Sequence, residues 1–227
     1  MEAESIPMPV VAPVRPNTVA ALSCRLLDIV VSVALLVALA PLFALIAIAI
    51  RLDTGGPVFF RQSRFGLGLS EFAMNKFRTM HTGTSTEPHR DYVVGLIRAD
   101  NSARPPANQG LYKLESDPRV TRVGRVLRRF SLDELPQLWN VLRGDMSLVG
   151  PRPALPYEVE HYPAHWYERF SVRPGITGLW QVSGRNHLTF DQMVDLDLDY
   201  ARRRSFWLNL LILAKTPWVM VHGKGSA

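Results

Sequence analysis

The chain has 227 residues and a formal net charge of +6, a length that suits one domain with a sizeable core or a smaller domain with an anchor. Among its 26 basic residues, only Lys76, Lys113, Lys215 and Lys224 are lysines. The positive charge therefore resides mainly on guanidinium groups, which suit phosphate contacts, and the expected partner is anionic: nucleic acid, a membrane surface or a phosphorylated small molecule. The single cysteine, Cys24, excludes a disulfide framework and favours a reducing, cytoplasm-facing location.

Two regions of different composition make up the first 52 residues. Residues 1–20 carry several prolines and few large side chains, which predicts a disordered tail without chemistry. Residues 29–50 contain no charged side chain, and as a helix they would extend about 33 Å, enough to cross the hydrocarbon core of a bilayer. A cleaved signal peptide is disfavoured, because the apolar run begins too far from the start and continues beyond Ala38-Leu39-Ala40.

The residues alone leave the path of this apolar segment open. Basic residues flank it on both sides: Arg15, Arg25, Arg51, Arg61 and Arg64. Neither flank is clearly favoured as the cytoplasmic one for a spanning helix. Pro41 removes a helical hydrogen bond and clashes with the preceding turn, so a sharply bent, re-entrant hairpin would explain both the proline and the two basic flanks. A simple span stays the alternative, because membrane helices tolerate proline.

The next segment predicts a small β-hairpin and then a long loop. The strands are expected in PVFFRQ (57–62) and EFAMNKFRTM (71–80), joined by a turn at Gly66 and Gly68. Alternation along the second strand puts Lys76 and Arg78 on one face. Residues 82–112 are polar and interrupted by prolines and a glycine, which indicates a surface loop.

Two helices with basic residues are expected further along the chain. From Arg119 an apolar stripe recurs at helical spacing, and Arg122, Arg125 and Arg129 share a narrow sector. That sector is either a solvated basic face or a contact for lipid head groups or substrate phosphate. Near the C-terminus, SFWLNLLILA (205–214) follows three arginines and precedes Lys215. It predicts either a helix lying in the membrane interface or a buried core helix.

An acidic pair, Asp133 and Glu134, stands in this arginine-rich chain. Ser131 and Glu134 have the spacing of a capping box, which would make the glutamate structural. Pro136, however, fits the first position of a helix, so that the helix would begin after the pair and leave both acids in the approach turn. Adjacent carboxylates repel unless a cation compensates, and one or two carboxylates with a substrate phosphate are a frequent Mg²⁺ site.

Other constellations are weaker. His161 and His165 are separated by Pro163, and the helical zinc pattern is absent. Asp195 and Asp197 have the D-x-D spacing of a metal-dependent glycosyltransferase. The alternative is a helix capped by Thr189 and Gln192, in which Asp195 and Asp197 are largely solvated.

These residues together resemble the bacterial sugar transferase family, the monotopic polyprenyl-phosphate phosphoglycosyl transferases. The resemblance runs from about residue 25 to the C-terminal helix, through the apolar segment with its central proline and four motifs: GGPVFF, KFRTM, RVGRVLRRFSLDELPQLWNVLRGDMSLVGPRP and RPGITGLWQVSGRN. It implies the short form of the family, whose members often start exopolysaccharide repeats with galactose or glucose. Where members commonly have Ser-Pro at the helix break, this chain has Ala40-Pro41, so the bend would depend on the proline.

The resemblance also implies an architecture and a location. The expected fold is α+β: a disordered tail (1–20), a re-entrant membrane helix broken at Pro41 (21–52) and a cytoplasmic catalytic domain (53–227) with a small β-hairpin, mainly helical structure and interfacial amphipathic helices. The protein would lie on the cytoplasmic face of the bacterial inner membrane, contact its lipid and bind no nucleic acid. The oligomeric state, including a homodimer, stays open.

Site roles are implied residue by residue. Asp133 would attack the sugar-bearing phosphorus of a UDP-sugar and expel UMP, after which undecaprenyl phosphate would take the phosphosugar from the aspartate. Glu134 would bind Mg²⁺. The expected phosphate contacts are Arg128, Arg152, Lys76 and Arg173.

Two competing functions come from the residues themselves. A metal-dependent glycosyltransferase built on Asp195 and Asp197 would release UDP instead of UMP. A non-enzymatic adaptor would bind anionic lipid through the arginine stripe and would not need Asp133. The released nucleotide and the effect of replacing Asp133 separate these functions from the phosphoglycosyl transferase.

Overall fold

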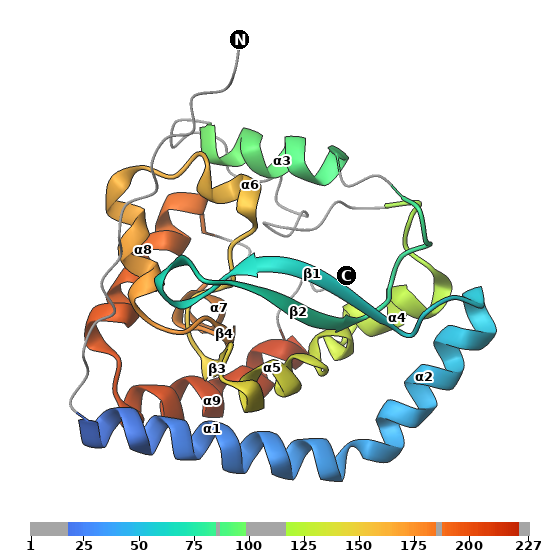
Figure 1. Cartoon of the computed structure of the whole chain (residues 1–227), viewed down its shortest axis with the longest axis horizontal. Helices are drawn as coiled ribbons and strands as arrows, with labels where there is room; N and C mark the ends of the chain where they lie inside the picture. Colours follow the sequence, from blue (N-terminus) through green and yellow to red (C-terminus); the bar gives the residue numbers. More distant parts are fainter. Residues whose placement is uncertain (1–17, 85–86, 99–116, 185–187, 223–227) are drawn as a thin grey trace.

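The computed structural model describes residues 18–84, 87–98, 117–184 and 188–222 and combines many helices with two small sheets (Figure 1). The helices are α1 (Thr18–Ala38), α2 (Ala40–Thr54), α3 (Glu87–Arg98), α4 (Arg122–Arg129), α5 (Gln137–Arg143), α6 (Pro156–Val159), α7 (Leu179–Ser183), α8 (Phe190–Arg203) and α9 (Phe206–His222). The strands are β1 (Phe59–Phe65), β2 (Glu71–Phe77), β3 (Ser147–Val149) and β4 (Gly175–Thr177). Three 3-10 helices are described: η1 (Leu67–Leu69), η2 (Leu132–Glu134) and η3 (Ala164–Ser171). This mixture agrees with the expected α+β composition.

The apolar N-terminal segment forms two helices instead of one. α1 ends at Ala38 and α2 begins at Ala40, with Leu39 between them. The break precedes Pro41 because the proline lies in the first turn of α2, where its missing N–H costs no helical bond. α1 is long and apolar enough to cross a membrane by itself. It begins at Thr18, so residues 18–20, expected in the tail, are helical, whereas residues 1–17 lie outside the described part. The re-entrant path stays a prediction.

The predicted hairpin is confirmed, with shifted ends. β1 and β2 pair antiparallel from Phe59↔Phe77 to Phe65↔Glu71. The chain reverses through η1, where Gly68 has a φ of 61°, a left-handed conformation that glycine adopts without a steric penalty. The first strand extends to Phe65 because the turn begins only at Gly66, and the second ends at Phe77 instead of Met80.

The loop expected over residues 82–112 contains a helix, so that prediction is wrong over part of its length. α3 occupies Glu87–Arg98, packs against α6 and α8, and buries Val93 completely. Pro88 had indicated a loop, but it is the second residue of the helix, where a proline is tolerated. Residues 85–86 and 99–112 of the expected loop lie outside the described part.

The two short parallel strands hold the backbones at Gly150 and Gly175 close together. β3 and β4 pair through Ser147↔Gly175 and Val149↔Thr177. A Cβ atom on Gly150 would lie 2.3 Å from the carbonyl oxygen of Arg173, and one on Gly175 would lie 2.0 Å from the Gly150 nitrogen. The backbones approach too closely for any side chain at either position, which fixes the start of the Pro-Arg-Pro segment.

An apolar surface lies along α1 and α9, which contact each other at one edge of the molecule (Figure 1). Its exposed side chains are Leu22, Leu26, Val30 and Val33 on α1, and Trp207, Leu211 and Trp218 on α9. α9 buries Asn209 and Ile212 on its other side, so it is neither a fully buried core helix nor a free one. It also continues to His222, with Pro217 inside it, instead of ending before Lys215. Exposed apolar area of this kind is typical of a membrane-contacting surface.

Candidate active site

The acidic pair lies in η2, which joins α4 to α5 and packs against β2. Ser131, directly before η2, has a φ of 54°, the left-handed region that is strained for residues other than glycine. Its side chain makes no capping bond to the helix, so the capping-box interpretation is wrong. α5 begins at Gln137, after Pro136, which confirms that the regular helix starts beyond the pair.

Asp133 is buried next to an arginine. Its exposed fraction is 8%, and its charge acts on Arg128 from the preceding helix. Burial lowers the pKa of the Arg128 guanidinium, while the carboxylates of Asp133 and Asp117 act in the opposite direction. Arg128 is also fixed by a hydrogen bond of 3.0 Å from its Nε to Thr79 Oγ1. The structure therefore brings together two residues that the sequence analysis had assigned to the same site.

An ion pair between Arg119 and Asp117 extends this group of charges. Arg119 donates from Nη2 to Asp117 Oδ2 at 2.6 Å, and this hydrogen bond is the largest cause that lowers the pKa of Asp117. Neither Asp117 nor Arg119 is among the site residues expected from the sequence. The sequence signal that could have found Asp117 is the aspartate itself, a residue type typical of turns. In the structure its Oδ1 accepts a hydrogen bond from Arg119 N at 3.0 Å.

Glu134 is paired with a lysine from the hairpin. Lys76 Nζ lies 3.3 Å from Glu134 Oε1, and the two side chains are 22% and 34% exposed. Below them, the buried Asn140 of α5 accepts from Asn75 N at 3.0 Å and donates to Ala73 O at 2.8 Å. These bonds fasten α5 to β2, so that Lys76 is held beside the acidic pair.

The side chains present fit a Mg²⁺ ion that binds mainly through substrate and water. Among the described residues, no three potential ligands of the His, Cys, Asp and Glu types come together. Mg²⁺ needs no such cage, because it commonly uses one or two carboxylates together with substrate phosphates. Glu134, partly exposed and adjacent to Asp133, would supply such a carboxylate.

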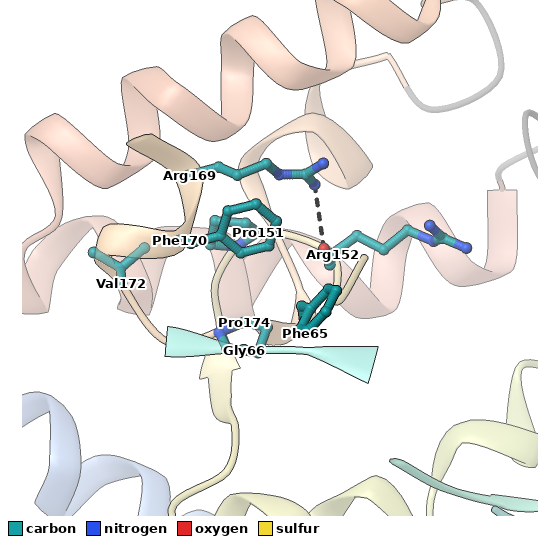
Figure 2. A pocket seen from close by; sticks show the side chains of 8 residues that line it. All are labelled: Phe65, Gly66, Pro151, Arg152, Arg169, Phe170, Val172 and Pro174. Atoms are coloured by element: carbon teal, nitrogen blue, oxygen red, sulfur yellow. Dashed lines mark hydrogen bonds between the residues drawn. The ribbon is translucent and has the colours of Figure 1, made fainter. Parts of the chain in front are cut away.

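Arg152 of the Pro-Arg-Pro segment lies in a different, closed network. Its Nη1 is 3.2 Å from Oε1 of Glu158, which is completely buried. Burial alone would raise the pKa of Glu158, but Arg152 and Arg64, together with the Leu155 N–H and Arg169, lower that pKa below its ordinary value. The segment's backbone is held as well, because Arg64 donates to Pro153 O at 2.9 Å. Arg169 donates to Arg152 O at 3.2 Å (Figure 2).

The pocket beside this segment is too small for a nucleotide sugar. Figure 2 shows it between Phe65, the Pro-Arg-Pro segment and Phe170. Its empty volume is about 170 Å³, below the ~300–1,000 Å³ typical of small-molecule sites. It is a packing space between the hairpin and the segment.

Arg173 lies at the other end of α5 from the acidic pair. Its Nε donates to the carbonyl oxygen of Gly144, the C-cap of α5, at 2.9 Å. After burial, the groups that shift its pKa are Arg25, Arg204 and Asp28. None of these belongs to the group around Arg128, so the structure does not bring Arg173 together with Asp133.

Among the described residues, the two weaker constellations of the sequence do not form metal sites. Asp195 is exposed, whereas Asp197 is completely buried and paired with Arg169. The helix is capped by Thr189 and Gln192 as predicted, but the expectation that its acids are solvated is wrong for Asp197, which faces the core. His161 hydrogen-bonds the carbonyl oxygen of Tyr157. The D-x-D arrangement is therefore not open to a metal.

The fold and the site together indicate a class of protein. A buried carboxylate next to an arginine, with a partly exposed carboxylate and a lysine beside it, suits a substrate that carries phosphate groups. The apolar surface on α1 and α9 suits contact with a membrane. These features are typical of a membrane-associated protein that acts on phosphorylated substrates.

Comparison with known families gives the specific assignment. The model of the family described as "Bacterial sugar transferase" matches residues 19–223. The chain therefore belongs to the bacterial sugar transferase family, which confirms the resemblance in its motifs.

Relatives differ in how much of their length the chain covers. The exopolysaccharide production protein ExoY of Sinorhizobium fredii is 40% identical over 215 residues, which are 94% of this chain and 91% of that protein. The UDP-glucose:undecaprenyl-phosphate glucose-1-phosphate transferase of Caulobacter vibrioides is 42% identical, over 88% of this chain and 70% of its own length. The UDP-galactose-lipid carrier transferase of Erwinia amylovora is 38% identical over 89% of this chain, which spans only 41% of that protein.

Proposed function

We propose that the protein transfers a sugar 1-phosphate from a UDP-sugar to undecaprenyl phosphate, giving undecaprenyl-diphospho-sugar and UMP. The observation that carries the proposal is the placement of Asp133: a buried carboxylate in a strained turn, next to Arg128 and adjacent to a partly exposed second carboxylate. The names of the relatives, which include undecaprenyl-phosphate galactose and glucose phosphotransferases, support the substrate class.

In the first half-reaction, a carboxylate oxygen of Asp133 attacks the phosphorus that bears the sugar. The bond between that phosphorus and the bridging oxygen of UMP breaks, and UMP leaves with the electron pair. The product is an aspartyl-phosphosugar. Covalent catalysis of this kind divides one difficult displacement into two easier ones.

In the second half-reaction, a phosphate oxygen of undecaprenyl phosphate attacks the same phosphorus. The bond to the Asp133 oxygen breaks, and the free carboxylate is regenerated. No net proton or redox change is needed. The sum is one UDP-sugar and one lipid phosphate converted into one lipid diphosphosugar and one UMP.

The surrounding charges make attack by an anion on an anion feasible. Arg128 is held next to Asp133 by Thr79, so its guanidinium can bind the transferred phosphoryl group without reorganisation. Lys76 adds a second cation at Glu134. Bound at Glu134, Mg²⁺ would neutralise charge on the diphosphate and polarise its phosphoryl oxygens.

We further propose that α1 and α2 form a re-entrant hairpin, which enters and leaves the inner membrane on its cytoplasmic side. The two halves pack against the same globular part: α1 against α5 and β3, and α2 against α4. Asp53, at the end of α2, accepts from Val123 N of α4 at 3.1 Å. Contacts from both halves to one domain support a path that returns to its starting face.

The test uses the full-length protein in lipid nanodiscs that contain undecaprenyl phosphate. A panel of UDP-galactose, UDP-glucose and their N-acetylated counterparts is supplied with Mg²⁺, and the released nucleotide is identified. The proposal expects UMP, in equal amount to the lipid diphosphosugar, from at least one donor. Release of UDP would contradict it and would favour a glycosyltransferase.

The covalent step has its own test. Without the lipid acceptor, the protein should release one equivalent of UMP and gain the mass of one sugar phosphate. Asp133→Asn should do neither, whereas Asp195→Asn, which alters an exposed acid outside the site, should behave as the wild type. An unmodified wild-type protein that still turns over would contradict the aspartyl intermediate.

A further inference from the structure

Three arginines from distant parts of the sequence meet at the C-terminal end of α5. Arg25 of α1 donates to Val141 O at 2.6 Å and to Leu142 O at 2.8 Å. Arg173 donates to Gly144 O at 2.9 Å. Arg204, between α8 and α9, completes the group, because its charge and that of Arg25 both act on Arg173.

This cluster, Arg25, Arg173 and Arg204, carries more positive charge than its surroundings compensate. The carboxylate that acts on it is Asp28, and both Asp28 oxygens already accept hydrogen bonds, from Ser147 Oγ and from Leu148 N. Among the groups that shift the pKa of Arg173, the two arginines thus outnumber the single carboxylate. The last carbonyls of α5 offset part of this excess through the helix dipole, but they are occupied by Arg25 and Arg173.

Donor atoms of the cluster are available for a ligand. Within the described residues, Arg173 uses only its Nε in a hydrogen bond, and Arg204 interacts with the thiol of Cys24. Both side chains are partly exposed. Guanidinium groups with open donor pairs bind phosphate oxygens in a bidentate manner.

The cluster borders the apolar surface of α1 and α9. Leu22 and Leu26, on either side of Arg25 in α1, are each 64% exposed, and Trp207, three residues after Arg204, is 75% exposed. Arginine beside exposed leucine and tryptophan is the arrangement expected at the level of lipid head groups.

The cluster is separate from the candidate active site. Asp133 precedes the N-terminus of α5, and the cluster binds carbonyls at its C-terminus. The charges that act on Arg128 are Asp133, Asp117 and Arg119, whereas those that act on Arg173 come from the cluster and Asp28.

We propose that this cluster binds the phosphodiester of a phospholipid with a net negative headgroup, with its acyl chains along Leu22, Leu26 and Trp207. Phosphatidylglycerol has this chemistry, because its phosphate carries the only charge of its headgroup. A zwitterionic lipid brings a cation that the three arginines would repel. The site does not depend on the transferase reaction, so the failure of either proposal leaves the other intact.

The test compares two adjacent arginines. The full-length protein and the variants Arg204→Gln and Arg203→Gln are taken from nanodiscs of mixed phosphatidylglycerol and phosphatidylcholine, and retained lipid is measured by intact-complex mass spectrometry. Arg203 is an exposed residue paired with Asp199, so its variant is the control. We expect one phosphatidylglycerol on the wild type and on Arg203→Gln, and retention reduced by about tenfold in Arg204→Gln. Equal retention in all three, or equal retention of both lipids, would overturn the proposal.

Two further measurements on the wild type distinguish a lipid headgroup from a soluble phosphate as the ligand of the cluster. Added salt should weaken phosphatidylglycerol binding and leave phosphatidylcholine binding unchanged. Millimolar inorganic phosphate or glycerol phosphate should not displace the lipid. Displacement by either soluble anion would identify a site for free phosphate and contradict a lipid site.

Discussion

Asp133 and Asp197 are both buried carboxylates next to an arginine, yet they lie in regions with opposite properties. Asp197 is in the middle of α8, completely buried, and its partner Arg169 also donates to Tyr162 Oη and to the backbone of Arg152. Asp133 is in a three-residue 3-10 helix beside a strained serine, and its neighbour Glu134 is partly exposed. One carboxylate belongs to a closed network, and the other lies at the edge of an open group of charges.

This difference shows that burial beside an arginine does not by itself identify a reactive carboxylate. The Asp197–Arg169 pair is enclosed in the core, where it holds elements together and is not exposed to a substrate. A nucleophile also needs a path for its substrate and a cation left to bind that substrate. We therefore expect substitutions at the two aspartates to separate activity from stability.

The largest expected effect is on activity at the open site. Asp133→Asn removes the nucleophile and keeps the shape of the side chain, so turnover should fall by more than about a thousandfold. The melting temperature should stay close to that of the wild type. UMP release and thermal unfolding in detergent measure the two quantities, and a variant that keeps a tenth of the wild-type turnover would contradict the role of Asp133.

The matching change in the closed network should have the reverse profile. Asp197→Ala leaves Arg169 buried without its carboxylate, which should cost about 3–5 kcal/mol of stability. Protein that remains folded at low temperature should still release UMP. A stable but inactive Asp197→Ala protein would place Asp197 in the chemistry and would remove the contrast between the two regions.

Sequence patterns predicted the open region better than the closed one, for a physical reason. The acidic pair and Pro136 are local in sequence, so their spacing indicated a turn before a helix, and the family resemblance added Arg128 as a phosphate contact. The Arg152–Glu158 and Arg169–Asp197 pairs depend on tertiary packing that no spacing encodes. Asp197 was consequently expected in solvent, and Arg173 was expected near Asp133 although it binds the far end of α5.

The helical segments show the same limit. The break of the apolar segment was expected because a proline acts locally, and the structure moves it by only two residues, to Leu39. α3 was missed because Pro88 and the polar residues around it outweighed a short apolar pattern. That pattern becomes decisive only when α6 and α8 cover Val93.

A smaller effect is expected at the metal carboxylate of the open site. Glu134→Gln keeps a side-chain oxygen but removes the charge, so the Mg²⁺ concentration for half-maximal turnover should rise by about 10–100-fold. Saturating Mg²⁺ should restore part of the activity, as it cannot for Asp133→Asn. Titration of Mg²⁺ against UMP release measures the shift, and an unchanged midpoint would assign the metal to other groups.

The smallest effect is a pH dependence of stability in the closed network. Arg152 and Arg64, together with the Leu155 N–H and Arg169, overcome the effect of burial and hold the pKa of Glu158 below its ordinary value of 4.5. Between the folded pKa and about 4.5 the unfolded chain binds more protons, so the contribution of Glu158 is complete above pH 4.5 and declines on acidification, with a slope of at most ~1.4 kcal/mol per pH unit.

Glu158→Gln should therefore be less stable than the wild type at pH 7, and the difference should narrow below about pH 4.5. Melting temperatures of both proteins from pH 7 to pH 3 measure this convergence. A difference that stays constant over the whole range would mean that the charge of Glu158 does not stabilise the Pro-Arg-Pro segment. If the two melting temperatures converge at low pH and both proteins release UMP equally fast at pH 7, the Glu158 network has a structural role and no part in the chemistry of Asp133.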